Sequence, residues 1–191
     1  MFNREVEILA PKDLGTTGTE VIDINVVDPL SSIELIWQTT VVTAALMTAP
    51  HVACISKIEL VDGSDVLFSL SGEEAQALAF YSTGKMPLNL VSVKAAEYMK
   101  SVIPIYFGRK LYDKQLALDP KRFKNLQLKV SWDEDAANAS VVANQLTVRG
   151  TVFDEKAITP VGFLMSKEVK SYTPAASTYE YTDMPTDHPY R

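Results

Sequence analysis

Cysteine is almost absent from this chain of 191 residues, in which Cys54 stands alone. A single cysteine cannot form an internal disulfide, so the sequence excludes the small secreted scaffolds that disulfides hold together. Cys54 lies beside Val52 and Ile55, and we interpret it as a small buried apolar residue. Its presence does not decide the cellular compartment.

Long apolar runs are also missing. The first residues, Met1–Glu7, are charged from the start and lack the apolar centre of a signal peptide. The longest weakly polar run, Thr39–Pro50, is rich in threonine and far shorter than the roughly 20 residues that cross a bilayer. We therefore expect a chain that is made in the cytosol and has no transmembrane anchor.

Histidine is scarce as well, with only His51 and His188. Nucleophilic triads depend on a histidine, and metal enzymes on a jelly-roll scaffold need a cluster of them. His51 and Cys54 form a His-x-x-Cys pair, but zinc normally takes four ligands and no second pair exists. We expect no catalytic residue, no metal and no cofactor, and hence no enzyme.

Three further motifs have simple interpretations. The acidic run Asp133–Asp135 is not followed by the glycine and glutamate of a calcium-binding loop, so we predict a solvated acidic loop. The segment Gly15–Gly18 has no following lysine or helix and is read as a turn, not as a phosphate site. Asn138–Ser140 matches a glycosylation acceptor, which we attribute to chance because no secretory signal precedes it.

Positive charge is in deficit over the whole chain but not everywhere along it. The net charge is −6, which disfavours nucleic acid as a specific partner. Residues 100–130 are the exception, with a net charge of +6 that leaves −12 for the rest of the chain. Such asymmetry can orient like subunits by pairing a basic region with an acidic region of a neighbour, or it can belong to a solvated loop. The basic residues are Lys100, Arg109, Lys110, Lys114, Lys121, Arg122, Lys124 and Lys129.

Alternation of apolar and polar residues is the main pattern that is present. It predicts half-buried strands at 22–26, 33–37, 55–61, 66–70, 88–94, 102–107, 126–132 and 141–152. Asp62-Gly63 between two of them predicts a tight hairpin turn. Pro104 is best tolerated at a sheet edge or a bulge.

Helical signals are few and local. Ser71 and Glu74 form a capping box before an Ala- and Leu-rich segment, and Gly84 suits the C-terminal cap, so we predict one helix over about 71–84. Asp119-Pro120 predicts a helical turn near 119–124. The fold class is therefore all-β, an eight-stranded antiparallel jelly-roll β-sandwich with one short inserted helix.

The length favours one domain with appendages, since domains average about 150 residues. We assign residues 1–155 to the jelly roll. The polar, proline-bearing residues 156–191 are assigned to a C-terminal connector or arm.

Two segments, taken in their order along the chain, resemble segments of a known protein family. They are Ile55–Pro87, with its hairpin, capped helix and Gly-Lys-Met-Pro exit, and Ile103–Asp133, with Ile-Pro-Ile-Tyr-Phe-Gly-Arg and Leu-Asp-Pro. Their order and spacing are similar to those of the double jelly-roll major capsid proteins of tailless icosahedral viruses, particularly bacteriophages. The resemblance implies two upright jelly rolls per subunit and homotrimers that look hexagonal. It further implies an icosahedral shell, usually over an internal membrane.

The chain departs from that family in length. Two jelly rolls need about 300 residues at about 150 per domain, so the chain is either the first half of such a protein or a single-jelly-roll relative. We expect a self-associating capsid protein that is made in the host cytoplasm, is found in the virion and contacts other capsid proteins. The alternative is a carbohydrate-binding β-sandwich, in which aromatic side chains would stack on sugars; the candidates are Trp37, Trp132, Tyr179 and Tyr181. Both tryptophans, however, lie on the apolar face of their predicted strands, which favours packing in the core.

Overall fold

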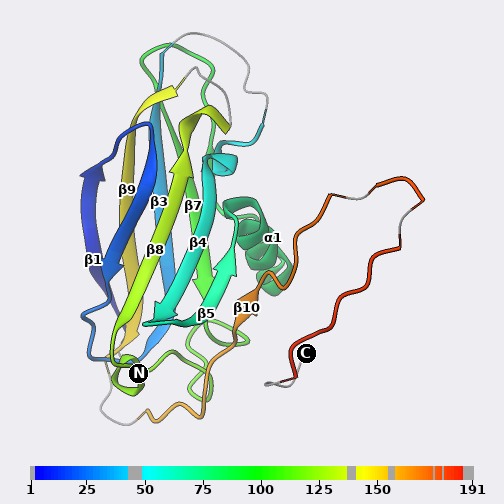
Figure 1. Ribbon diagram of the computed structural model, residues 1–191. Helices are drawn as coiled ribbons and strands as arrows, with labels where there is room; N and C mark the ends of the chain where they lie inside the picture. The colour runs from blue at the N-terminus through cyan, green and yellow to red at the C-terminus, as the bar shows by residue number, and fades with distance from the viewer. Residues whose placement is uncertain are drawn as a thin grey trace.

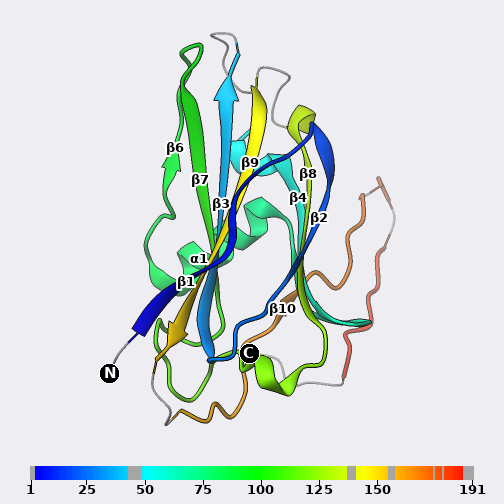
Figure 2. The ribbon, with the colours of Figure 1, turned by 90° about the vertical axis from the view of Figure 1, so that its left-hand side faces the viewer.

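Two five-stranded sheets pack face to face in a computed structural model, which describes residues 3–42, 49–136, 141–154, 158–173, 175–177 and 179–186. One sheet has the order β1 (Asn3–Asp13), β9 (Val141–Phe153), β3 (Leu30–Val41), β7 (Tyr98–Tyr106) and β6 (Asn89–Leu90). The other has the order β10 (Ser166–Lys167), β5 (Asp65–Leu70), β4 (Ile55–Asp62), β8 (Leu126–Asp133) and β2 (Thr17–Asp23). Figure 2 shows the two layers from the side.

The strand order is that of a jelly roll. The chain changes sheet at every step from β1 through β4 and again from β7 through β9, so most hydrogen-bonded neighbours are distant in sequence. All pairs are antiparallel except the short β5–β10 pair. Eight strands have six or more residues, while β6 and β10 have two each. The predicted fold class is confirmed, with ten described strands in place of eight.

The hairpin and the helix form as their local sequence predicts. Asp62 and Asp65 pair across the β4–β5 turn, where Gly63 has a φ of 61°. Helix α1 (Gly72–Thr83) begins with the predicted capping box, in which Ser71 Oγ accepts from the Glu74 N–H at 3.3 Å and Glu74 accepts from the Ser71 N–H at 2.8 Å. Gly84 ends it in the left-handed conformation. Figure 1 shows α1 on the side of the sandwich opposite β1.

The core lies between the sheets and follows the alternation of the strands. In β8 the buried residues Leu126, Leu128, Val130 and Trp132 alternate with more exposed ones. Fully buried side chains of β3 and β7 meet them from the other sheet, among them Trp37 and Ile103. Short 3-10 turns close the ends of the sandwich at η1 (His51–Cys54), η2 (Pro120–Arg122) and η3 (Glu134–Ala136). The first turn of η2 is capped by Asp119, as predicted.

Pro104 lies at a sheet edge, which confirms its predicted position. The backbone N–H of Val102 donates to the Leu88 carbonyl at 2.9 Å on the outer side of β7. The nitrogen of Pro104, two residues further along the strand, faces the same side beyond the end of β6. Its missing N–H therefore costs no hydrogen bond of the sheet.

Three strand predictions need correction. The strand predicted at 88–94 shrinks to Asn89–Leu90, because only these residues pair with β7. The strand predicted at 22–26 instead occupies Thr17–Asp23, where it pairs with β8. The strand β1 was not predicted, because its exposed charged residues at an edge obscure the partly buried Val6 and Ile8.

The chain after β9 first follows the sandwich and then leaves it. Val161 N–H donates to the Gln115 carbonyl, Leu164 N–H donates to the Phe107 carbonyl, and the Phe163 ring packs edge-on against Phe107 at 6.3 Å. The described residues from 167 onward are exposed. Figure 1 shows this last part extending away from the sheets. Within the described ranges, no helix has the length and apolar character needed to cross a membrane.

Candidate functional site

His51 and Cys54 are structural residues. His51 is 3% exposed, with Nε2 2.9 Å from Thr39 Oγ1 and Nδ1 2.8 Å from Ser101 Oγ. Burial lowers the pKa of His51 to about 4, so the imidazole is neutral at pH 7. Cys54 is fully buried in the core, as predicted. The described residues contain no group of three or more potential metal ligands, and His188 lies outside them.

The acidic loop differs from the prediction at one residue. Glu134 is buried, and its carboxylate accepts a hydrogen bond from the Asn144 amide at 2.7 Å. Its backbone N–H donates to the Thr16 carbonyl at 3.0 Å, so the turn η3 holds the glutamate inside. The prediction of a solvated loop is therefore wrong for Glu134, while Asp133 and Asp135 are exposed. The acceptor motif Asn138–Ser140 lies outside the described residues.

Only the first half of the Gly15–Gly18 segment lies outside the strands. Thr17 and Gly18 begin β2, where they pair with Asp133 and Trp132, so the predicted turn is wrong for these two residues. The Gly15 carbonyl accepts hydrogen bonds from Trp132 Nε1 at 2.8 Å and from the Asn144 amide at 3.0 Å. The segment leads into strand β2 and not into a helix, so it lacks the helix N-terminus of a phosphate-binding loop.

The two tryptophans pack against each other inside the sandwich. Their ring centroids are 6.2 Å apart, and the exposed fractions are 0% for Trp37 and 5% for Trp132. Neither ring offers a face on which a sugar can stack. Tyr179 and Tyr181 are 90% and 71% exposed, so the carbohydrate-binding alternative keeps only these two residues.

The basic segment is brought largely to one end of the sandwich. Six of its eight cations lie in the loops and the turn η2 that join the end of β7 to the start of β8, while Lys100 and Lys129 lie on strands. Arg109 pairs with Asp113, and Arg122 donates to the Val161 carbonyl at 3.2 Å.

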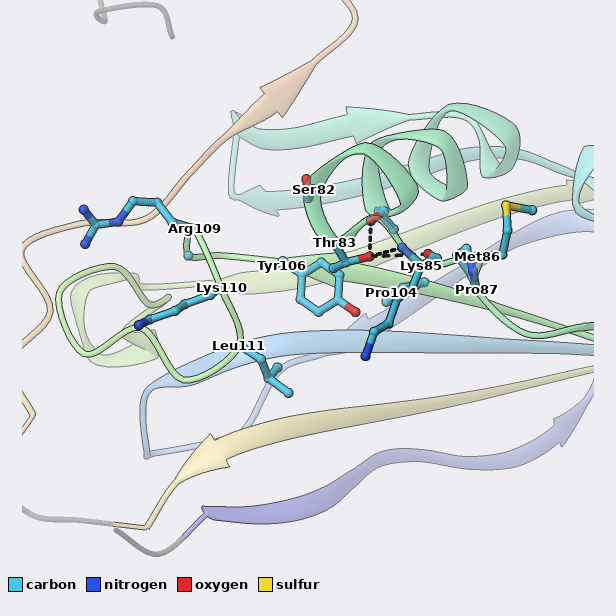
Figure 3. Close-up of a pocket in the computed structure, with 12 residues that line it drawn as sticks. Ser82, Thr83, Lys85, Met86, Pro87, Pro104, Tyr106, Arg109, Lys110 and Leu111 are labelled. Carbon is cyan, nitrogen blue, oxygen red and sulfur yellow. Dashed lines mark hydrogen bonds between the residues drawn. The ribbon is translucent and has the colours of Figure 1, made fainter.

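A groove of about 440 Å³ opens between the end of α1 and the loop that follows β7. Figure 3 shows Tyr106 between the helix end, with Lys85 and Met86, and the loop residues Arg109–Leu111. The lining contains three cations and no carboxylate. Sequence reasoning missed this groove because its residues come from two stretches that lie apart in the sequence, 79–87 and 104–111. The apolar residues after α1 were the available signal.

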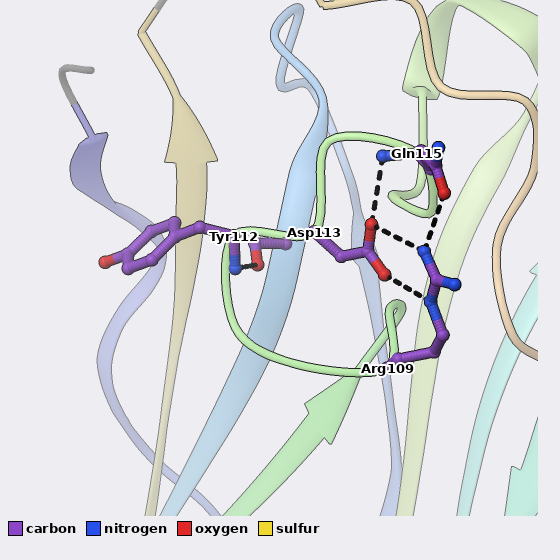
Figure 4. Close-up of polar contacts among 5 residues, drawn as sticks. Arg109, Tyr112, Asp113 and Gln115 are labelled. Atoms are coloured by element: carbon purple, nitrogen blue, oxygen red, sulfur yellow. Dashed lines mark hydrogen bonds and ion pairs between the residues drawn. The ribbon is translucent and has the colours of Figure 1, made fainter.

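The loop beside the groove is held in place by Asp113. Its carboxylate accepts from Arg109 Nε at 2.8 Å and from the Gln115 N–H at 3.0 Å, as Figure 4 shows. The hydrogen bond from Arg109 lowers the pKa of Asp113 to about 2, so the carboxylate is charged throughout the neutral range. Tyr112, with a φ of 63°, donates its N–H to Ser31 Oγ at 2.7 Å and ties the loop to β3.

Asp113→Ala is expected to lower the free energy of unfolding by about 2 kcal/mol. The substitution removes the buried carboxylate that accepts from Arg109 and from the Gln115 N–H, and a hydrogen bond to a charged group contributes about 1.5–3 kcal/mol. Urea denaturation at pH 7 measures the change. Lys110→Ala, an exposed change in the same loop, is the control and should leave stability within about 0.5 kcal/mol. Equal effects of the two substitutions would contradict the role of Asp113.

The fold is similar to those of viral capsid proteins. The major capsid protein of Sulfolobus turreted icosahedral virus matches with a TM-score of 0.63 and 14% identity, over 80% of this chain and 49% of that one. The PBCV-1 virus capsid matches with a TM-score of 0.58 and 11% identity, over 79% of this chain and 41% of that one. No family model matches the chain, and no curated protein matches it in sequence.

These likenesses show the fold. The chain has a jelly-roll fold that is similar to those of the viral capsid proteins. It spans about half or less of the length of those proteins.

Proposed function

We propose that this chain is a structural protein of a virus particle and acts by self-association, not by catalysis. The observation that carries the proposal is the jelly-roll topology with its likeness to two capsid proteins over about four fifths of the chain. The protein is made in the host cytoplasm and resides in the virion. A bacteriophage-type virus is favoured by the resemblance of the segments 55–87 and 103–133.

The subunit that we propose has two jelly rolls, of which residues 1–155 form the first. Residues 156–191 then connect to a second one, and the match to at most half of the capsid proteins agrees with this arrangement. Three such subunits form a pseudo-hexagonal capsomer of six jelly rolls. A single-jelly-roll relative reaches the same ring with six copies. Neighbouring capsomers, other capsid proteins and an internal viral membrane are the remaining partners, and specific nucleic acid is not among them.

Size-exclusion chromatography with light scattering tests this function. We expect a mass of three or six times 21.1 kDa, and ring-shaped particles in electron micrographs of concentrated protein. A strict monomer with measurable turnover on a substrate would overturn the proposal. Glycan binding that is lost on Tyr179→Ala or Tyr181→Ala would overturn it in favour of the carbohydrate-binding module.

A further inference from the structure

Exposed apolar side chains are concentrated on one edge of the sandwich. Of the twenty large hydrophobic residues that are exposed in the described part of the chain, nine lie between Leu78 and Tyr98. Tyr81 and Met86 are the most exposed of them, at 83% and 71%. Many apolar side chains exposed on one edge mark an interaction site more often than apolar residues exposed singly. We call α1, residues 84–98 and residues 109–111 the α1 edge.

The α1 edge is also basic where the groove opens. Lys85, Arg109 and Lys110 line the groove, and Lys85 and Lys110 are exposed. Arg109 already has Asp113 as a partner, but no carboxylate is among the residues that line the groove. The edge as a whole holds four cations against the carboxylates Glu73, Glu74 and Glu97, so its excess of positive charge lies at the groove. A partner that covers the groove therefore needs both apolar contact area and negative charge.

The opposite edge of the same sandwich carries that negative charge. Strands β1 and β2 are the outermost strands of the two sheets on one side, just as β6 and β10 are on the other. Residues 3–28, which we call the β1–β2 edge, contain six carboxylates and two cations, a net charge of −4. Glu5 and Glu7 are exposed on β1, and Val21 and Val27 add exposed apolar area at 50% and 63%.

We propose that the α1 edge binds the β1–β2 edge of a second copy of this chain. This inference rests on the six-copy form of the proposed function, in which neighbouring jelly rolls are copies of this chain, and it names the surface through which the copies associate. The two edges lie on opposite sides of the molecule, as Figure 1 shows for α1 and β1. The contact is therefore head-to-tail, and a head-to-tail contact closes into a ring when its rotation permits.

Charge decides between this arrangement and a symmetric one. In a symmetric dimer through the α1 edge, Lys85 and Lys110 of both copies would face each other across the interface. Like charges placed together at an interface are unfavourable, while the head-to-tail contact sets these lysines against Glu5 and Glu7. The unequal charge distribution along the chain thus becomes the feature that orients neighbouring copies.

Paired charge reversals test the contact. One variant carries Lys85→Glu and Lys110→Glu, and the other carries Glu5→Lys and Glu7→Lys; all four side chains are exposed. We expect each variant alone to raise the dissociation constant at least about tenfold in sedimentation measurements at low salt. Mixing the two variants should restore assembly, and so should combining all four substitutions in one chain. The control, Lys57→Glu with Lys170→Glu, makes the same charge change at exposed residues outside both edges and should leave the constant unchanged.

The results separate this inference from the proposed function. Thermal melts first establish that each variant is folded. If the unmodified chain assembles but the reversals have no effect, the edges named here are wrong while the capsid function stands. If the Lys85 and Lys110 reversals weaken assembly but the Glu5 and Glu7 reversals do not, the symmetric arrangement replaces the head-to-tail one. An unmodified chain that stays monomeric overturns this inference, and a monomer with measurable turnover on a substrate overturns the proposed function as well.

Discussion

Replacing Trp37 with alanine is expected to lower the free energy of unfolding by about 4 kcal/mol. Trp37 is fully buried in β3 and packs against Trp132 across the two sheets, with ring centroids 6.2 Å apart. Removing the indole leaves a cavity that the close-packed sheets fill only in part, which adds to the lost transfer free energy. Urea denaturation followed by fluorescence and circular dichroism measures the loss.

Tyr181→Ala is the matched control for this experiment. It also removes an aromatic ring, but the ring is 71% exposed and lies beyond the strands. We expect a change of less than about 0.5 kcal/mol. A Trp37→Ala variant as stable as the Tyr181→Ala variant would show that the tryptophan pair is not the centre of the core.

Local chemistry explains which elements could be predicted from the sequence. The β4–β5 hairpin depends on Asp62-Gly63, and α1 depends on Ser71, Glu74 and Gly84, all within or next to the element they specify. The alternation in β8 is likewise visible within the strand itself, since apolar and polar residues take turns along its sequence. These elements form as predicted because neighbouring residues alone determine their backbone conformation.

Tertiary partners explain what could not be predicted. Glu134 is buried because Asn144 of β9 and Thr16 before β2 supply its hydrogen bonds. The strand expected at 88–94 ends at Leu90 because β7 offers no further pairing to it. In both cases the deciding residues are remote in sequence, so residue patterns within a short window carry no information about them.

The α1 edge and the β1–β2 edge were also only partly predictable from the sequence. The excess of positive charge in residues 100–130 is visible in the sequence, as is the negative charge of residues 3–28. The sequence does not reveal that these charged regions lie on opposite edges, because only the sheet order puts β1 and β2 at one side and β6 with α1 at the other. The groove adds Lys85, which lies outside the basic segment and joins it through folding.

Acidification from pH 7 to pH 4 is expected to destabilise the protein by about 3 kcal/mol through His51. The pKa of this histidine is about 4 in the folded chain, and the ordinary value of 6.5 applies when the chain is unfolded. Burial is the cause, and the ring contacts two neutral hydroxyl groups, of Thr39 and Ser101. Below pH 6.5 the unfolded chain therefore takes up a proton that the folded chain refuses until about pH 4. Stability from this group is complete above pH 6.5 and is lost as the pH falls through that interval.

His51→Gln isolates the effect, because glutamine keeps hydrogen-bonding capacity in the pocket but does not titrate. Urea denaturation of both proteins at pH 7, 6, 5 and 4 measures the difference in pH dependence, and His188→Gln serves as the control for the other histidine. The raised pKa of Glu34, which burial causes, acts in the opposite direction but is common to all three proteins and cancels. We expect the unmodified protein and His188→Gln to lose stability in parallel, while His51→Gln loses about 3 kcal/mol less. Parallel curves for all three proteins would mean that the buried imidazole is protonated in the fold, and that its two hydroxyl neighbours stabilise the cation instead of the neutral ring.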